Sequence, residues 1–531
     1  MVKQSLRFIL FIYSSIGCLW AQSDFRMIGF FSDDGPIMRN YWPADIPADQ
    51  LTHLNYAFAI PKDTDGDQRF EAVMGNSELA YLKPVPRRVS VTDTTRNEHL
   101  GILRQLRALK RQYPHLRILL SVGGACLYNA QSGQCESIND RFKAIISSEE
   151  RLQHFVSSVV LLMTHPFPEG EDQQLFDGLD LDWEFPDAAD KAGYVQLLKA
   201  LRRKLDTATR VERRTFLLTA DGPATSFFMQ HYDVPAVAAV VDWVNVMTYL
   251  YHMPQSWNDH TGHNAPFGQA FSDPHGAGYE ISQTSVRAWQ HAGLPPEKMT
   301  MGLSYFGVGY RGVGSVGNSF LPGLYQRYRG ALVTGGEIPY ADLWSRFDAE
   351  AGWKMYWDEA AQCPFLYNAR TQSWISYDDP ESLRRKAVWA RKNRLAGIFV
   401  WELSQEFNAR QPVRHPLTNV LFEASVARTE TATGAWSAKP TLSATEFRNF
   451  TTILVRIASP SEVDLQILDA QDQPVRQLLH ESLVMPGYYR IPVWGSSLKP
   501  GTYQIVLSIQ AKTFQINGAS VRYKVPVTRL P

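Results

Sequence analysis

Four acidic residues lie close together in the stretch Asp177-Gly-Leu-Asp180-Leu-Asp182-Trp-Glu184. In a β-strand alternate side chains point to the same face, so Asp180, Asp182 and Glu184 share one face and the apolar residues between them share the other. Neighbouring carboxyls on that face are about 6–7 Å apart, and like charges at this range raise the pKa of at least one of them. A carboxyl that keeps its proton near neutral pH is a general acid, so we expect Glu184 to protonate the leaving oxygen in glycoside cleavage.

A solvated acidic turn and a divalent-metal site are the two other interpretations of this run. A turn does not explain why the apolar residues alternate so regularly with the acidic ones. The sequence has no Cys-x-x-Cys or His-x-x-x-His pair, so we expect no zinc site. We also expect no other metal and no cofactor. General acid catalysis is favoured over both, mainly because of the family resemblance described below.

The acidic run belongs to one of eight short apolar segments that alternate with amphipathic stretches. The predicted strands are Met27–Phe31, Leu54–Ala59, Arg117–Val122, Leu179–Asp182, Phe216–Ala220, Trp243–Thr248, Thr300–Tyr305 and Gly397–Trp401. Eight buried strands that alternate with helices favour an α/β fold, a closed (β/α)8 TIM barrel, over an open sheet. The chemistry of such barrels takes place at the C-terminal ends of the strands, where Glu184 would lie.

The domain boundaries follow from the same pattern. We expect the barrel domain to occupy residues 24–425, with an inserted α+β subdomain at about 308–376 that forms one wall of the cleft. Residues 429–440 are predicted to be a linker rich in Thr, Ala, Gly and Ser. Residues 441–531 are predicted to form a small all-β sandwich. Its predicted strands are Thr451–Ile457, Val463–Leu468, Tyr488–Val493, Thr502–Ile509 and Val521–Val527.

The N-terminus has the pattern of an export signal. Lys3 and Arg7 precede an almost wholly apolar run at residues 8–20, which is short for a membrane span. We therefore expect residues 1–21 to be a cleaved signal peptide, and the protein to be secreted or at the cell surface. The tetrapeptide ending at Cys18 loosely resembles a lipoprotein cleavage box, so a lipid anchor there is the alternative.

Charge and cysteine content limit the partners. Lys plus Arg and Asp plus Glu both number 53, and a neutral protein has no general attraction to nucleic acid or to anionic membranes. Cys126 and Cys135 are close enough in a loop-like stretch to form a local disulfide in an oxidising compartment. Cys363 would then be a buried free thiol. We expect a monomer without a membrane span.

The acidic run resembles the signature Asp-x-x-Asp-x-Asp-x-Glu of glycoside hydrolase family 18, the family of many chitinases, and matches it in full. Five further segments resemble other motifs of the family: Ser121-Val-Gly123-Gly124, residues 46–58, Asn245-Val-Met247-Thr-Tyr249, residues 377–382 and residues 397–404. Six motifs in the expected order are not a coincidence. The resemblance extends over residues 25–425.

The resemblance implies a substrate-assisted mechanism, in which the 2-acetamido oxygen of the sugar attacks its own anomeric carbon to form an oxazolinium intermediate. Glu184 would be the acid, Asp182 would orient the acetamido N–H, and Asp180 would tune Asp182. Tyr249 would bind the acetamido carbonyl and Trp401 would form the floor under the sugar. We also expect substrate contacts from Met247, Trp183, Tyr305, Phe58 and Trp42, and structural roles for Asp177, Ser121, Gly123 and Gly124. The substrate would be chitin or a related glycan that contains N-acetylglucosamine.

Some of these residues have a plainer interpretation. Without the resemblance, core packing is the favoured role of Met247 and Tyr249. Ser121 and the two glycines after it are also compatible with tight barrel packing alone. Asp177 has the opposite strand parity from Asp180, so we expect it to bond the backbone near the start of the strand.

The sequence departs from the family at two positions. Leu250 stands where the family has Asp after the tyrosine, and Val308 stands where it often has Arg. Replacing both members of an ion pair with apolar residues can be energetically neutral, so we expect Leu250 and Val308 to form an apolar patch beside the scissile bond. The change predicts slower turnover or a substrate other than plain chitin.

Three functions remain open. The favoured one is an endo-acting chitinase. An endo-β-N-acetylglucosaminidase on another N-acetylated glycan and a weakly catalytic chitin-binding lectin are the alternatives, and the presence of Glu184 argues against the lectin. The C-terminal domain loosely resembles the immunoglobulin-like modules of bacterial secreted proteins, with sorting, glycan binding and spacing as its possible roles.

Overall fold

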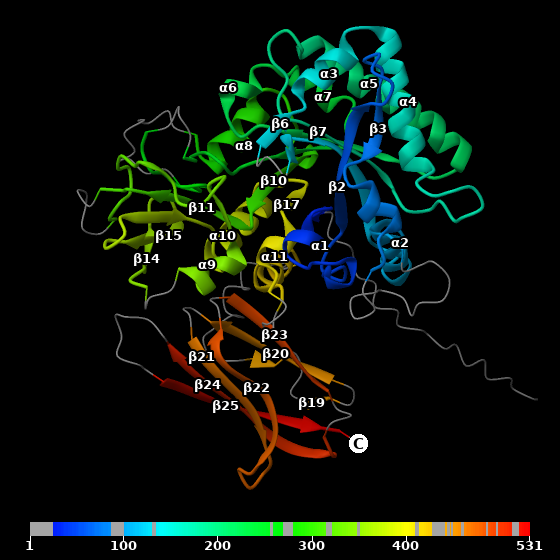
Figure 1. The fold of residues 1–531 in the computed structure, drawn as a ribbon. Helices are drawn as coiled ribbons and strands as arrows, with labels where there is room; N and C mark the ends of the chain where they lie inside the picture. The colour runs from blue at the N-terminus through cyan, green and yellow to red at the C-terminus, as the bar shows by residue number, and fades with distance from the viewer. Residues whose placement is uncertain are drawn as a thin grey trace, which may run out of the picture.

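The fold is an eight-stranded parallel barrel with an inserted sheet, followed by a separate set of β-strands (Figure 1). The computed structural model describes residues 25–85, 100–129, 134–254, 259–268, 280–314, 321–347, 351–408, 414–426, 441–442, 446–447, 450–457, 461–484, 487–494, 498–511 and 520–530. The predicted signal peptide at 1–21, with the alternative anchor at Cys18, and the predicted linker at 429–440 lie outside these residues.

Eight parallel strands form the closed barrel, because β1 pairs with both β2 and β17. The strands are β1 (Arg26–Ser32), β2 (His53–Asp63), β4 (Arg117–Gly124), β7 (Gly178–Trp183), β8 (Leu217–Gly222), β9 (Trp243–Val246), β10 (Met299–Ser304) and β17 (Gly397–Trp401). Each coincides with a predicted strand, so the barrel prediction is confirmed. β3 (Phe70–Met74) pairs antiparallel with β2 at its outer end.

Helices cover the outside of the barrel. The longer ones are α2 (Ile102–Gln112), α3 (Asn139–Ile146), α4 (Glu149–Thr164), α5 (Lys191–Glu212), α8 (Ser282–His291), α10 (Pro380–Lys392) and α11 (Pro416–Val426). Shorter ones are α1 (Gly35–Met38), α6 (Ser226–Met229), α7 (Val234–Ala238) and α9 (Tyr340–Arg346). Their apolar faces pack on the outward side chains of the strands, Leu179 and Leu181 of β7 among them, and form the largest hydrophobic core.

A second sheet extends from the barrel between β10 and α10. Its six strands are β11 (Phe306–Arg311), β12 (Gly330–Ala331), β13 (Glu337–Pro339), β14 (Lys354–Asp358), β15 (Cys363–Asn368) and β16 (Ser373–Ser376). They lie in the region predicted to be the inserted subdomain. A buried ion pair anchors the return to the barrel: the Nζ of Lys386 lies 2.6 Å from a carboxylate oxygen of Asp378.

The C-terminal strands form two further sheets. One contains β18 (Thr441–Leu442), β20 (Phe450–Ile457) and β23 (Gly487–Trp494). The other contains β19 (Glu446–Phe447), β21 (Ser461–Leu468), β22 (Pro474–Val484), β24 (Gly501–Ala511) and β25 (Ser520–Arg529). The five predicted strands are present, and β22 and the two-residue strands β18 and β19 are additional. Apolar side chains from both sheets form their shared core.

The structure describes the state of two of the four cysteines. Cys126 is disulfide-bonded, and Cys363 is a buried free thiol. Cys135 lies on the strand that pairs with that of Cys126, and its side chain is outside the described residues. Across the described ranges, no helix is both long enough and apolar enough to cross a membrane.

Candidate active site

Asp180 forms the base of the candidate site, in the interior of the barrel. It is fully buried, and its carboxylate accepts hydrogen bonds from the hydroxyls of Ser121 (2.8 Å) and Thr219 and from the side-chain amide of Asn245 (3.1 Å). These donors come from β4, β8 and β9. Asp180 is therefore fixed in place by the strands on both sides of β7 and by β9.

Glycines allow β4 to approach this row closely. Gly123 has a φ of 134°, and a Cβ there would lie 1.8 Å from the carbonyl oxygen of Asp182. At Gly124, with a φ of 97°, a Cβ would lie 3.0 Å from the ring of Phe58. Only glycine adopts this backbone without strain and leaves that space empty. The predicted structural role of both glycines agrees with this geometry.

Asp182 and Glu184 continue the row toward the C-terminal end of β7. Burial, together with the charges of Glu184 and Asp180, raises the pKa of Asp182 well above its usual range. Burial and the nearby Glu337 raise the pKa of Glu184 from 4.5 to about 7. Glu184 is half-buried, so it is open to a ligand. Because its pKa is about 7, it is also protonated for much of the time near neutral pH.

The Oδ1 of Asp182 is buried, and it accepts no hydrogen bond among the described residues. A buried acceptor without a partner costs free energy, which a ligand that donates an N–H would recover. This oxygen is therefore a candidate for recognition of an amide.

Aromatic rings surround the upper end of the row. Trp401, at the end of β17, stacks on Phe58 with ring centres 5.6 Å apart, and its edge meets Phe30 at 5.5 Å. Tyr249 packs edge-on against Phe306 at 5.9 Å. Met247 belongs to the same apolar cluster as these rings. The structure thus brings Trp401, Phe58, Met247 and Tyr249 together, as the sequence predicts. Flat apolar rings of this kind suit the apolar face of a sugar.

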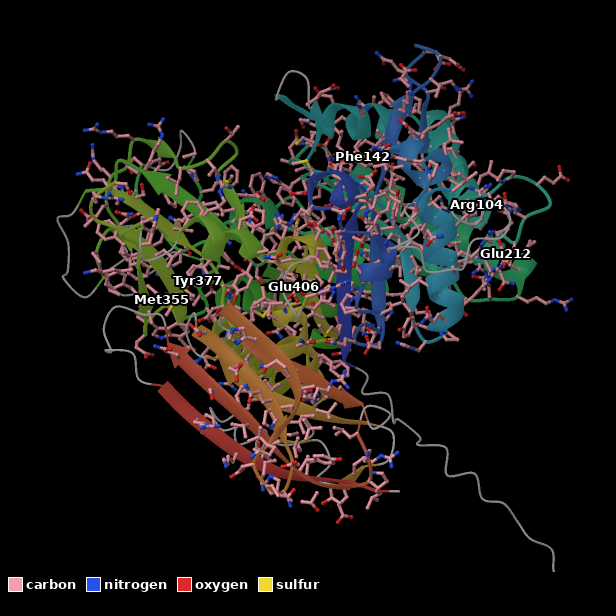
Figure 2. All side chains as sticks on the ribbon, turned by 60° about the horizontal axis from the view of Figure 1, so that its bottom comes forward. Arg104, Phe142, Glu212, Met355, Tyr377 and Glu406 are labelled. Carbon is pink, nitrogen blue, oxygen red and sulfur yellow. The ribbon has the colours of Figure 1, made fainter. Side chains whose placement is uncertain are left out.

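Two predicted substrate contacts require correction. Trp183 points away from the barrel interior: its ring stacks on Phe142 of α3 at 5.0 Å, and its indole N–H donates to the side chain of Asn139. Phe142 is labelled in Figure 2. Tyr305 is fully buried in the outer core, where its hydroxyl bonds that of Thr418 in α11. Both are core residues, because their strand parity directs the side chain toward the helices.

Trp42 and Asp177 lie at other places. Trp42 is buried just before a short 3-10 helix, and its indole N–H donates to the side chain of Asn40. Among the described residues no ring contact joins Trp42 to the aromatic group, so its contact with substrate stays a prediction. Asp177 accepts hydrogen bonds from the backbone amide of Ile118 and from Lys110, which is the structural role expected for it.

Three features of the site were not predicted from the sequence. Asp221 of β8 is a buried carboxyl whose pKa is raised by burial and by the charges of Asp180 and Asp182. The strand predicted at residues 216–220 ends one residue before Asp221. Had the predicted strand included residue 221, the alternation of side chains would have placed Asp221 on the same face as Thr219. The other two features are Glu337 of the inserted sheet and an aromatic patch beside Glu184.

The aromatic patch consists of Phe185, Phe227 and Phe228. Phe185 follows Glu184 in the chain and packs on Phe228 of α6, with ring centres 4.9 Å apart. Phe228 in turn meets Phe227, whose side chain is 66% exposed. Large exposed apolar side chains that are grouped together usually mark a binding surface. The patch cannot be predicted from the sequence alone, because residues 185 and 227 are far apart in the chain.

Leu250 and Val308 both contribute to the apolar cluster that contains Tyr249. Val308 is fully buried, while Leu250 is half-buried with a left-handed φ of 59°, and its backbone amide donates to the side chain of Asn264. Apolar surroundings at both positions agree with the predicted patch. Direct contact between the two side chains stays a prediction.

The arrangement as a whole suits acid catalysis on a neutral, N-acetylated ligand. Within the described ranges, no group of three or more His, Cys, Asp or Glu side chains is placed to hold a metal ion. Glu184, a proton donor with a raised pKa, lies in a row of buried carboxyls. Next to it are the Oδ1 of Asp182, which can accept a hydrogen bond from an amide, and the stacked rings of Trp401 and Phe58. These are the parts that proton transfer to a leaving oxygen requires.

Comparisons with known proteins point to one enzyme family. A model of the family described as glycosyl hydrolases family 18 matches residues 26–406. Chitinase A1 of Niallia circulans is 28% identical over 434 residues, which cover 73% of this chain and 57% of that protein. The chain therefore corresponds to little more than half of that relative.

Solved structures show the same fold. A chitinase from Bacillus thuringiensis has a TM-score of 0.65 at 23% identity, with 95% of this chain and 84% of that one covered. A family 18 N-acetylglucosaminidase from Paenibacillus barengoltzii has a TM-score of 0.57 at 26% identity, with 75% and 99% covered. The first likeness includes most of the C-terminal strands, and the second is confined to about the length of the barrel domain.

Proposed function

Because the chain belongs to glycosyl hydrolases family 18 and is a glycoside hydrolase, we propose that it hydrolyses β-1,4-linked N-acetylglucosamine polymers, chitin first among them. The observation that carries this proposal is the half-buried Glu184, whose pKa is raised to about 7, at the open end of the carboxyl row. A carboxyl in this state can donate a proton at neutral pH. The names of the relatives support chitin as the polymer.

The proposed reaction needs no nucleophile from the protein. Glu184 gives its proton to the glycosidic oxygen, and the bond from that oxygen to the anomeric carbon breaks. The acetamido oxygen of the same sugar attacks that carbon and forms an oxazolinium ion, while Asp182 accepts a hydrogen bond from the acetamido N–H. Water then opens the ring, Glu184 takes back a proton, and the configuration is retained. Intramolecular attack is fast because its effective concentration is high.

The supporting roles are part of the same proposal. Asp180, held by three donors, raises the pKa of Asp182 and supports its position. In this proposal Tyr249 binds the acetamido carbonyl through its hydroxyl, and Trp401, which stacks on Phe58, provides the floor for the sugar. An N-acetyl group is therefore a chemical requirement at the sugar whose bond is cleaved.

The test is hydrolysis of a chitin tetrasaccharide by the wild type and by the Glu184→Gln variant, with products identified by mass. The exposed Glu297→Gln variant is the matched control. Cleavage by the wild type and the control, lost in Glu184→Gln, supports the proposal. Equal cleavage by all three would refute the role of Glu184.

An endo-β-N-acetylglucosaminidase acting on another N-acetylated glycan is the second candidate. Leu250, in place of the acidic residue expected there, favours it, and one structural neighbour is described as an N-acetylglucosaminidase. Under this alternative the wild type would leave the tetrasaccharide intact and release sugar from N-glycan or peptidoglycan fragments, again only with Glu184 present.

We also propose that the protein is exported, with residues 1–21 removed. The basic, apolar and small-residue pattern of that segment supports the proposal. The N-terminal mass of the protein recovered from the culture medium tests it: a mature chain that starts after Ala21 is expected, and an intact chain retained in the cells would refute it.

A further inference from the structure

A cavity of about 470 Å³ opens at the N-terminal end of the barrel, away from the carboxyl row at the other end. Its wall includes the first residues of five parallel strands, which are Arg26 of β1, His53 of β2, Arg117 of β4, Leu217 of β8 and Trp243 of β9. A cavity of this volume is in the range of small-molecule sites. The proposed glycosidase reaction does not use it.

The charges around this cavity are mainly positive. Arg117 and Lys110 share one carboxylate, that of Asp177, at 3.3 Å and 2.5 Å. Arg26 is the third cation, and its guanidinium carbon lies 4.6 Å from the centre of the Trp243 ring. Three cations against one carboxylate leave two positive charges without a counter-charge in this group.

Carboxylates of the neighbouring segments do not belong to the wall of the cavity. Asp242, just before β9, lies 3.6 Å from Arg202, and Glu212, at the end of α5, lies 2.9 Å from Arg214. In the described part of the chain, the ionisable side chains that line the cavity are arginines and histidines. An anion that enters the cavity therefore meets cations and no carboxylate in its wall.

The wall also offers N–H groups that the described residues do not use. Arg117 donates through Nη1 to Asp177, which leaves its Nε and Nη2 without a hydrogen bond to the described residues. The Nδ1 of His53 lies 2.8 Å from the hydroxyl of Thr52, and its Nε2 has no partner within the described ranges. The carbonyl of Met27 already accepts from the backbone amide of Thr52, so the Thr52 hydroxyl can donate to Nδ1. The Nε2 of a neutral His53 then carries the hydrogen and can donate it to a ligand.

His53 contributes this N–H without adding a charge. Burial and the charges of Arg26 and Arg117 lower its pKa from 6.5 to about 3, so the ring is neutral at ordinary pH. The attraction for an anion therefore comes from the arginines.

We propose that this cavity binds a phosphate group, at the end of the barrel opposite the proposed active site. The two negative charges of a phosphate match the two positive charges that lack a counter-charge. Guanidinium N–H groups, such as the unused ones of Arg117, pair well with phosphate oxygens. The volume also leaves room for the organic part of a small phosphate ester. The inference does not rest on the proposed function.

The experiment is calorimetric titration of the whole protein at pH 8 and constant ionic strength, where a phosphate group carries about two negative charges. The ligands are inorganic phosphate, glucose 6-phosphate and the monoanion acetate. Arg117→Gln removes the charge of the exposed Arg117 side chain, and Arg117→Lys keeps it. Arg203→Gln, an exposed arginine of α5, is the control, and thermal unfolding checks that each variant is folded.

We expect phosphate to bind the wild type, Arg117→Lys and Arg203→Gln with a Kd on the order of 1 mM, and Arg117→Gln about tenfold more weakly, as the loss of one charged hydrogen bond predicts. Tighter binding of glucose 6-phosphate than of phosphate would identify an ester as the ligand, and equal or weaker binding would identify the free ion. Absence of phosphate binding by the wild type, equal affinity for acetate, or unchanged binding by Arg117→Gln would overturn the inference.

Discussion

The raised pKa of Glu184 predicts the pH range in which the enzyme works. The carboxyl must be protonated to act as the acid, so activity is present below its pKa and is lost as the pH rises through it. With a pKa of about 7, in place of the ordinary 4.5, the acid retains its proton into the neutral range. At pH 6 such a group is about 90% protonated, against about 3% for an ordinary glutamate, which is a roughly 30-fold difference in the active form.

The assay is the pH dependence of kcat/KM on a chitin oligosaccharide, since this ratio reports the pKa values of the free enzyme. We expect the alkaline limb to fall to half at about pH 7. An alkaline half-point near pH 4.5–5 would refute the reasoning, because it would mean that burial does not hold the proton on Glu184.

The Glu337→Gln variant refines the same test. The charge of Glu337 is the second cause of the raised pKa of Glu184, after burial. Removing a negative neighbour favours the ionised form of Glu184, so the alkaline limb should move to lower pH. A shift to higher pH would show that the two carboxyls do not interact in the manner described.

Three further predictions concern stability and binding. Burial raises the pKa of Asp33, Glu184 and Glu337 to about 7, so the folded state binds more protons than the unfolded state between about pH 4.5 and 7. The contribution of these three carboxyls to stability therefore falls as the pH rises through this range. We expect a lower Tm at pH 8 than at pH 5.5. An equal or higher Tm at pH 8 would contradict this. Lys386→Met leaves the buried Asp378 without its cation and should cost about 3–5 kcal/mol in the free energy of unfolding, measured by denaturant titration; a cost below about 1 kcal/mol, typical of an exposed pair, would be inconsistent with it. Phe228→Ala should raise KM for long chitin oligosaccharides and leave kcat nearly unchanged, because the ring binds without touching the reacting atoms; a fall in kcat at constant KM would argue against a binding surface at this patch.

The sequence predicts the barrel well because each of its strands is a short apolar run bounded by polar segments. The alternation within β7 predicts a shared face for Asp180, Asp182 and Glu184, which agrees with the buried, interacting carboxyls of the structure. The sequence does not predict β22, an edge strand of its sheet, because its aliphatic residues do not alternate with polar ones: Leu478 and Leu479 are adjacent, and Val475 is exposed.

Side-chain roles are harder to predict than strands. The substrate contact predicted for Trp183 is wrong, because its parity within β7 places it with Leu179 and Leu181, on the face that packs under α3. The prediction for Tyr305, at the end of β10, is wrong for the same reason. Neither Glu337 nor the Phe185–Phe228 contact has a signal in the chain, because both depend on segments that only folding brings together.

The measurement that tests the central claim most directly is proton NMR of the first product released from an N-acetylglucosamine tetrasaccharide. Substrate-assisted cleavage by Glu184 predicts that the new reducing end appears first as the β-anomer, with no product from Glu184→Gln. Initial release of the α-anomer would mean inversion by a bound water, and would contradict the mechanism. Cleavage at the wild-type rate by Glu184→Gln would contradict the assignment of the acid itself.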